Sequence, residues 1–380
     1  MSAARGAIAR AWCSLSWGWP RKRRLRDVDN HKNSLSRSPV TQTGAAAQWT
    51  LAFPALDRGH RSGPLAFAVI VLAAAALPSP VPAAGPKAAR EAFVTNQAGD
   101  SLSIVDLGAT APVLEITIGG KPAGIAMAPE GRHAYLTAPD GRELIVIDAD
   151  ARRITSRIAV GEGPLGVAAH PTDGRVFVAD WYAHTLFAVD TAAGKVIGSV
   201  PVGRSPSGVA VTGDGTRILT ADRDSNQVSV IDAATFTRIG TIGVGERPFG
   251  VTVDREGHRA YTANVASNDV SVIDLGAGKV VGTIKVGRRP YAVALAGGRG
   301  FVTNQYAGTV SVFDLESLAI IETVDVGGYP EGIEADPSGG AVYVACWEAN
   351  TLERIDTGTL EVTARIPVGD GPRAFGRFLR

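Results

Sequence analysis

The chain has 380 residues and carries 38 lysines and arginines against 37 aspartates and glutamates, so its length allows more than one domain and its overall charge is near zero. The charge is uneven, because residues 1–84 hold 11 basic and 3 acidic residues while residues 85–380 hold 27 basic and 34 acidic residues. An acidic body argues against a general binder of the nucleic-acid phosphate backbone. Cys13 and Cys346 lie on opposite sides of the cleavage site predicted below, which excludes an internal disulfide in the mature protein.

The first 55 residues show no pattern of a folded domain. Their basic run, RKRRLR at 21–26, lies too far before the nearest apolar segment to belong to a twin-arginine export signal. We expect residues 1–55 to be disordered or not translated, with a start near residue 56. An RNA- or membrane-binding arm is the alternative, but a run of like charges is more often a solvated segment.

Residues 56–84 have the three parts of a secretory signal peptide. Arg58 and Arg61 precede an unbroken apolar run from Leu65 to Leu77, and small residues follow at Ala83 and Ala84. Thirteen residues rise only about 20 Å as a helix, which is short of a bilayer core of roughly 30 Å. This pattern predicts export to the periplasm or the medium after cleavage near residues 84–86, with no transmembrane anchor. A buried core helix is the alternative.

Residues 88–380 are built from an internal repeat of about 42 residues. Two markers keep the same phase through seven copies. One is the aspartate that ends VSVID and its variants, found at Asp106, Asp148, Asp190, Asp232, Asp274, Asp314 and Asp356. The other is a proline, found at Pro122, Pro164, Pro206, Pro248, Pro290, Pro330 and Pro372. Both series shorten by two residues in the fifth interval, so chance does not explain them.

Each copy predicts four short β-strands. GVAV at 208–211 is followed by an Asp-Gly turn, a segment like RAYTAN at 259–264, a polar loop, VSVID, a second turn and a segment like KVVGTI at 279–284. These segments are rich in β-branched residues and are separated by Gly, Pro or Asp, with no helical period. Four-stranded units repeated around an axis form a β-propeller. We therefore predict an all-β, seven-bladed propeller over residues 88–380.

The phase of the repeat predicts how the ring closes. The first copy begins at EAFVTN (91–96), which is the second strand of the unit, so the first blade lacks its innermost strand. The C-terminal segment GPRAFGRFL (371–379) aligns with the Pro-x-Gly start of the innermost strand in other copies. We expect this C-terminal strand to complete blade one.

The repeat also resembles a known family. FVTNQ at 93–97 and 301–305, together with VSVID and the GxxPxGVAV pattern, is similar to the YVTN family of β-propeller repeat proteins, and the similarity covers residues 91–380. The resemblance implies a surface-layer or periplasmic propeller. Related proteins bind single-stranded DNA or are encoded beside quinone-dependent alcohol oxidation systems. LTA at 136–138 and VAC at 344–346 depart from the signature without affecting the predicted fold.

Several chemistry-bearing patterns are better explained as structure. The seven aspartates recur once per blade, and an aspartate at a strand end accepts hydrogen bonds from the following turn. GEGPLG at 161–166 matches a dinucleotide loop only formally, because no helix follows it. The loop at 222–233 fails as a calcium site, since Gln227 stands where the turn needs glycine. HExxH, CxxCH and GxSxG patterns are absent from the sequence, so we expect no metal, no cofactor and no catalytic residue.

Residues that differ between copies are the better candidates for function. Those that flank the proline, or that follow the second strand, should gather at the mouth of the central channel. Eleven of them are arginine, lysine, aromatic or glutamate side chains and form the predicted ligand site: Lys121, Trp181, Arg223, Arg247, Phe249, Arg289, Tyr291, Tyr329, Glu331, Trp347 and Arg373. Loop-borne arginine and aromatic residues are typical of recognition surfaces. The alternative is that the aromatics only plug the gaps between blades. His184, near Trp181, is a further residue of interest.

Two functions from different classes are consistent with this sequence. The first is an exported, non-catalytic binding or scaffold propeller that recognises a protein or a small anionic or aromatic ligand at the channel mouth. The second, implied by the family resemblance, is an accessory or catalytic component of a periplasmic quinone-linked oxidoreductase system. Single-stranded nucleic acid is a weaker candidate partner, because the body is acidic. A fold alone does not choose between them.

Overall fold

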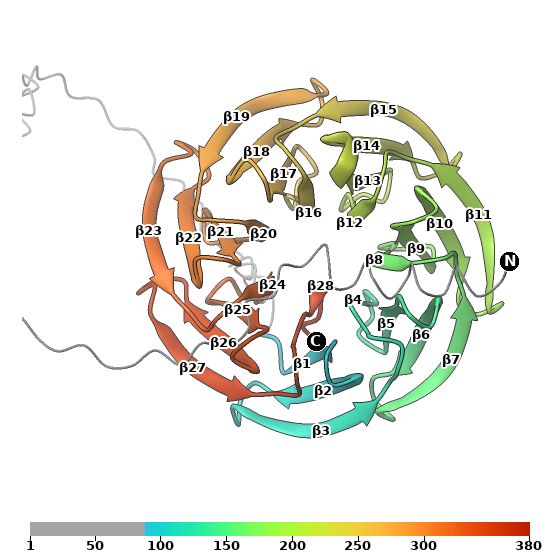
Figure 1. Cartoon of the computed structure of the whole chain (residues 1–380), viewed down its shortest axis with the longest axis horizontal. Coiled ribbons are helices and arrows are strands. Elements are labelled where there is room, and N and C mark those ends of the chain that lie inside the picture. Colours follow the sequence, from blue (N-terminus) through green and yellow to red (C-terminus); the bar gives the residue numbers. More distant parts are fainter. Residues whose placement is uncertain (1–87) are drawn as a thin grey trace, which may run out of the picture. The chain divides into compact units, whose positions relative to one another are not determined.

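The structure is a computed structural model that describes residues 88–380; the predicted prefix 1–55 and signal peptide 56–84 lie outside the described residues. In the described part, 28 strands and one 3-10 turn, η1 (Arg223–Ser225), form seven blades around a central axis (Figure 1). This confirms the seven-bladed all-β propeller. No helix within 88–380 is long and apolar enough to cross a bilayer.

The innermost strand of each blade starts at or just after the repeated proline. These strands are β4 (Gly124–Met127), β8 (Pro164–Ala169), β12 (Pro206–Val211), β16 (Pro248–Val253), β20 (Pro290–Ala296) and β24 (Pro330–Ala335). The glycine two residues after the proline lets neighbouring inner strands approach closely. A Cβ on Gly208 would lie 2.7 Å from the carbonyl oxygen of Phe249 in the next blade, closer than real Cβ atoms come. The Pro-x-Gly pattern of five copies therefore serves close packing, while the copies at Pro290 and Pro372 have Ala292 and Ala374 in place of the glycine.

The two middle strands of each blade supply the core. The second strands are β1 (Glu91–Asn96), β5 (His133–Ala138), β9 (Arg175–Asp180), β13 (Arg217–Asp222), β17 (Arg259–Asn264), β21 (Arg299–Asn304) and β25 (Ala341–Cys346). The third strands are β2 (Ser101–Asp106), β6 (Glu143–Asp148), β10 (Thr185–Asp190), β14 (Gln227–Asp232), β18 (Asp269–Asp274), β22 (Thr309–Asp314) and β26 (Thr351–Asp356). Both faces of the second strands are buried because blades stack against each other. The hydroxyls of Thr95, Thr137 and Thr303 also donate to carbonyls of the next inner strand, at 2.9, 2.6 and 2.8 Å.

The outermost strands are longer than the sequence suggested. They are β3 (Ala111–Thr117), β7 (Arg153–Ala159), β11 (Lys195–Pro201), β15 (Thr237–Gly243), β19 (Lys279–Lys285), β23 (Ile320–Asp325) and β27 (Val362–Pro367). Five of them have seven residues rather than the expected four to six. The register slips once along each pairing with the third strand, for example between Ala188 and Val189, so a β-bulge adds a residue to the outer strand.

The C-terminal segment closes the ring in blade one, as predicted. It forms antiparallel bridges with β1 at Asn96–Pro372 and Ala92–Leu379, and the Phe93 amide donates to the Phe378 carbonyl at 2.8 Å. The equivalent bridges in blade four, at Asp222–Pro206 and Ile218–Val211, enclose two fewer residues of the inner strand. The extra length bends inward as β28 (Phe375–Arg377), which pairs in parallel with β4 of blade two. One segment therefore joins blades one and two.

The repeated aspartates cap the turn that follows the third strand. In every blade the carboxylate oxygen Oδ1 accepts a hydrogen bond from the backbone two or three residues further on, as in Asp106 to Ala109 and Asp274 to Ala277, at 2.9 and 2.8 Å. These backbone donors hold the pKa of Asp232 and Asp356 below the ordinary 3.8. The structural interpretation of the seven aspartates is confirmed.

Candidate functional site

The predicted site lies on the face that holds two sets of loops, which we call the mouth connectors. One set joins an outer strand to the next inner strand, and the other joins the second strand to the third. In the first set, the residue before the proline adopts a left-handed φ between 52 and 64° in six blades, at Lys121, Ser205, Arg247, Arg289, Tyr329 and Gly371. This conformation costs a non-glycine residue about 1–2 kcal/mol, so something must hold it.

A side chain 21 residues earlier holds most of these strained positions. The backbone N–H of Arg247 donates to Asn226 Oδ1 at 2.8 Å, and that of Arg289 donates to Asn268 Oδ1 at 2.8 Å. His184 does the same for Ser205, accepting at Nδ1 over 3.1 Å. The interest of His184 in the sequence is therefore explained by a structural role. These bonds fix the direction in which the mouth side chains leave the backbone.

An aromatic cluster closes the axis beneath the mouth. The rings of Phe249, Tyr291 and Phe375 have centroids 4.3 to 5.4 Å apart, and each residue is buried. Trp181 extends the cluster at 6.3 Å from Phe249. Tilted and edge-to-face pairs of this kind add about 0.5–1.5 kcal/mol each beyond burial. We call Phe249, Tyr291 and Phe375 the floor of the mouth.

A buried polar network lies around that floor. Arg373 donates to Tyr291 Oη at 2.9 Å and to Gln97 Oε1 at 2.9 Å, and its Nε lies 3.2 Å from Glu331 Oε2. Gln305 Nε2 donates to Glu331 Oε1 at 2.5 Å. Burial raises the pKa of Glu331, and the nearby Arg373 charge opposes that rise. This network positions the closing strand and fixes the Tyr291 ring.

Three arginines surround the floor from separate connectors. Arg223 lies 5.4 Å from the Trp181 ring centroid and pairs with Asp224 at 2.8 Å. Burial lowers the pKa of Arg223, and the charges of Arg247 and Arg289 lower it further. Arg247 is exposed, and its guanidinium makes no ion pair or hydrogen bond within residues 88–380. The Arg223 guanidinium therefore lies within electrostatic range of both Arg247 and Arg289.

An aromatic shelf continues from Arg289 into the last blades. Arg289 lies 4.5 Å from the Tyr306 ring centroid and donates to the Tyr306 hydroxyl at 2.8 Å. Tyr306 packs edge-on against Tyr329 at 5.5 Å, and Tyr329 lies 6.5 Å from Trp347. We call Tyr306, Tyr329 and Trp347 the aromatic shelf. Their partly exposed rings offer stacking surface beside a cation.

The predicted residues are thus brought together unequally. Phe249 and Tyr291 lie in the buried floor, and Arg373 and Glu331 lie in the buried polar network around it. Five further predicted residues are half-buried around both: Arg223, Arg289, Trp181, Tyr329 and Trp347. Lys121 differs from the other predicted cations because its ammonium group is already paired: it donates to Asp100 at 2.7 Å and to the Ala98 carbonyl at 3.2 Å.

Sequence reasoning left out two residues of the mouth. Tyr306 directly follows the Gln305 that ends FVTNQ, so its place in the second-strand loop was a usable signal. Phe375 reaches the floor only because the closing strand bulges, which the alignment with Pro-x-Gly did not reveal. Cys346, by contrast, is buried in the core, and desolvation raises the pKa of its thiol.

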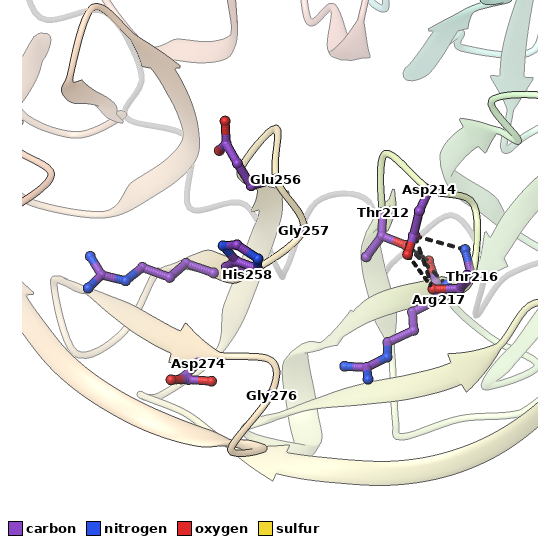
Figure 2. A pocket seen from close by; sticks show the side chains of 10 residues that line it. Thr212, Asp214, Thr216, Arg217, Glu256, Gly257, His258, Asp274 and Gly276 are labelled. Atoms are coloured by element: carbon purple, nitrogen blue, oxygen red, sulfur yellow. Dashed lines mark hydrogen bonds between the residues drawn. The ribbon is translucent and has the colours of Figure 1, made fainter.

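The opposite face carries a different cavity (Figure 2). It has a volume of about 490 Å³ and lies between the β12–β13 and β16–β17 turns, with the β18–β19 turn at its edge. Its Asp214 accepts hydrogen bonds from Thr212 at 2.6 Å and from the Thr216 amide at 3.0 Å, and these lower its pKa. The carboxylate is therefore used by its own turn, as the repeated aspartates are.

Comparison with known proteins supports the fold but gives no family. No family model matches the chain, and no curated protein matches it, so the YVTN resemblance stays a prediction. Kuenenia stuttgartiensis hydrazine synthase matches over 67% of this chain and 88% of its own, with 20% identity and a TM-score of 0.61. A functionally unknown protein from Desulfotomaculum acetoxidans matches over 77% and 98%, with 15% identity and a TM-score of 0.65. Identities this low show the fold alone.

Proposed function

We propose that this protein is an exported, non-catalytic binding propeller that recognises a ligand or a protein partner at its mouth. The observation that supports this best is a set of unrepeated arginine and aromatic side chains, carried on stiffly held connectors above a closed floor. Repeated polar groups elsewhere serve the fold. The arginine and aromatic side chains at the mouth differ between blades, so they are the candidates for recognition. Arginine and large aromatic residues contribute most of the binding energy in protein interfaces.

The proposal is tested by comparing two faces of the full chain. Arg247 is exposed and should contribute no more than about 0.5 kcal/mol to stability, whereas the half-buried Arg289 also donates a hydrogen bond to Tyr306, worth about 1 kcal/mol. The Arg247→Ala/Arg289→Ala double variant should therefore lower the free energy of unfolding by no more than about 1.5 kcal/mol. It should weaken binding of whatever copurifies from a periplasmic extract by more than about 1 kcal/mol, or roughly fivefold in Kd. Mass spectrometry identifies that species. Arg255→Ala, on the opposite face, is the matched control.

Each alternative has its own outcome in this experiment. Full affinity in the double variant, with loss in the Arg255 variant, would move the site to the opposite face. Capture of a dehydrogenase or cytochrome would support the quinone-linked oxidoreductase component. Single-stranded nucleic acid would have to bind with a steep dependence on salt.

Export is a separate part of the proposal. It predicts that N-terminal sequencing of the exported protein begins near residues 84–86. Recovery of exported protein that still carries residues 1–55 would contradict it.

A further inference from the structure

The mouth connectors divide into two sectors of opposite charge. The basic sector consists of the connectors 202–205, 223–226, 244–247, 265–268, 286–289 and 305–308, which hold five arginines and two acids. The acidic sector consists of the connectors 97–100, 118–123, 139–142, 160–163, 181–184, 326–329, 347–350 and 368–371, which hold two cations and five acids. The sectors therefore carry net charges of +3 and −3. The ring order of the blades keeps each sector continuous (Figure 1).

The positive charge of the basic sector is poorly compensated. Asp224 is committed to Arg223 at 2.8 Å and accepts from the Ser205 hydroxyl at 2.8 Å. Arg247 and Arg288 have no side-chain ion pair or hydrogen bond in the described part of the chain. In the acidic sector, by contrast, Lys121 is paired with Asp100. Like charges held close without a counter-charge favour an anionic ligand.

The aromatic rings beside the arginines also restrict the shape of the ligand. Trp181, Tyr306 and Tyr329 present partly exposed rings next to Arg223 and Arg289. A flat conjugated molecule can stack on such rings while its edge reaches the arginines. Carboxylates suit those arginines because a guanidinium binds a carboxylate through two parallel N–H bonds.

We propose that the ligand is a planar anion with two or more carboxylates, bound in the basic sector. More than one negative charge fits this sector because its connectors carry a net charge of +3 and because Arg247 and Arg289 lie on separate connectors. This inference rests on the proposed function, since it specifies what the mouth binds.

The test uses three probes of one size with the full chain, measured by isothermal titration calorimetry at low salt. Benzene-1,3,5-tricarboxylate is planar and charged, benzene-1,3,5-tricarboxamide is planar and neutral, and cyclohexane-1,3,5-tricarboxylate is charged but not planar. We expect the first to bind, the second to show no binding, and the third to bind at least tenfold more weakly. The affinity of the first should fall as salt rises.

Variants locate the bound probe. Arg247→Gln and Arg289→Gln should each lower the affinity for benzene-1,3,5-tricarboxylate at least tenfold. Arg142→Gln in the acidic sector and Arg255→Gln on the opposite face should leave it unchanged. Melting curves of all four variants confirm that they fold.

The failures are distinguishable. If the tricarboxamide binds as well as the tricarboxylate, the ligand class is wrong and the mouth remains the site. The same follows if the tricarboxylate does not bind but the arginine variants lose the copurifying partner. Unchanged binding of both probe and partner in the arginine variants would overturn the inference and the proposed function together.

Discussion

The two faces of this propeller use polar residues in opposite ways. On the face of the cavity in Figure 2, each blade repeats one aspartate that caps one turn, and Asp214 of the Asp-Gly turn likewise accepts hydrogen bonds from its own turn. On the mouth face, the repeated residues are asparagine, aspartate or histidine side chains that hold connectors in place, while the residues they hold differ from blade to blade. We call the repeated side chains that hold turns and connectors in place the frame. The mouth residues that differ from blade to blade are the displayed surface.

This contrast can be tested by separating stability from binding. A substitution in the frame should lower the free energy of unfolding and leave binding intact, while a substitution on the displayed surface should do the reverse. The closing strand belongs to both, so it should show the largest effects.

Deletion of residues 371–380 should have the largest effect. It removes the innermost strand of blade one, the Phe375 ring of the floor and the Arg373 network, and it exposes two strand edges that promote aggregation. We expect oligomers or aggregates in size-exclusion chromatography and a loss of the cooperative melting transition. A monomer with an unchanged melting temperature would show that the ring closes in another way.

Arg373→Met should cost about 3–5 kcal/mol in urea unfolding, because it leaves the buried Glu331 carboxylate without its charge partner. The double variant Arg373→Met/Glu331→Gln, which removes both charges, should recover part of that loss. If the double variant were as unstable as the single one, the loss would come from packing rather than from the buried charge.

The pH dependence of stability should include a contribution from Glu334 on β24. Its carboxylate accepts from the Phe378 and Leu379 amides at 2.5 and 2.7 Å, with Arg377 nearby, yet burial raises its pKa to about 7. A pKa raised in the folded state gives stability that is complete below the unfolded value and is lost as pH rises through the folded value. The free energy of unfolding should fall by on the order of 3 kcal/mol between pH 4.5 and 7.

Glu334→Gln provides the control for this pH dependence. The amide oxygen can still accept from the Phe378 and Leu379 amides, but it does not titrate. Urea unfolding at several pH values should show a flatter profile for the variant. Identical profiles for both proteins would assign the pH dependence to other groups.

Asp274→Ala should have the smallest effect on stability, about 1 kcal/mol, because it removes one capping hydrogen bond to the Ala277 amide. Ligand affinity at the mouth should be unchanged, since Asp274 lies on the opposite face. Calorimetric melting and titration of the same sample check both. A loss of binding without a loss of stability would break the distinction between frame and surface.

Much of the fold could be predicted because it depends on repeated residues. Asp106 to Asp356 and Pro122 to Pro372 gave the number of blades, and the missing first strand at Glu91 gave the closure. The floor could not be predicted in the same way. The two extra residues near Phe375 have no counterpart in the other copies, and a Cβ on Gly376 would collide with the Ile125 carbonyl, so the bend depends on a single glycine at φ 132°. Partners such as Trp181 and Arg223 also come from different blades, and spacing within one repeat does not report contacts between blades.

The closing strand also sets when the floor can be completed. Arg373 and Phe375 follow all the other blade strands in the chain, yet they contact Gln97, Phe249 and Tyr291 from earlier in the sequence. A growing chain can stack its first blades one by one, but the floor stays open until the final segment returns to β1. Within residues 88–380 the floor is therefore completed after the blades that surround it, and a product that lacks residues 371–380 has an incomplete floor.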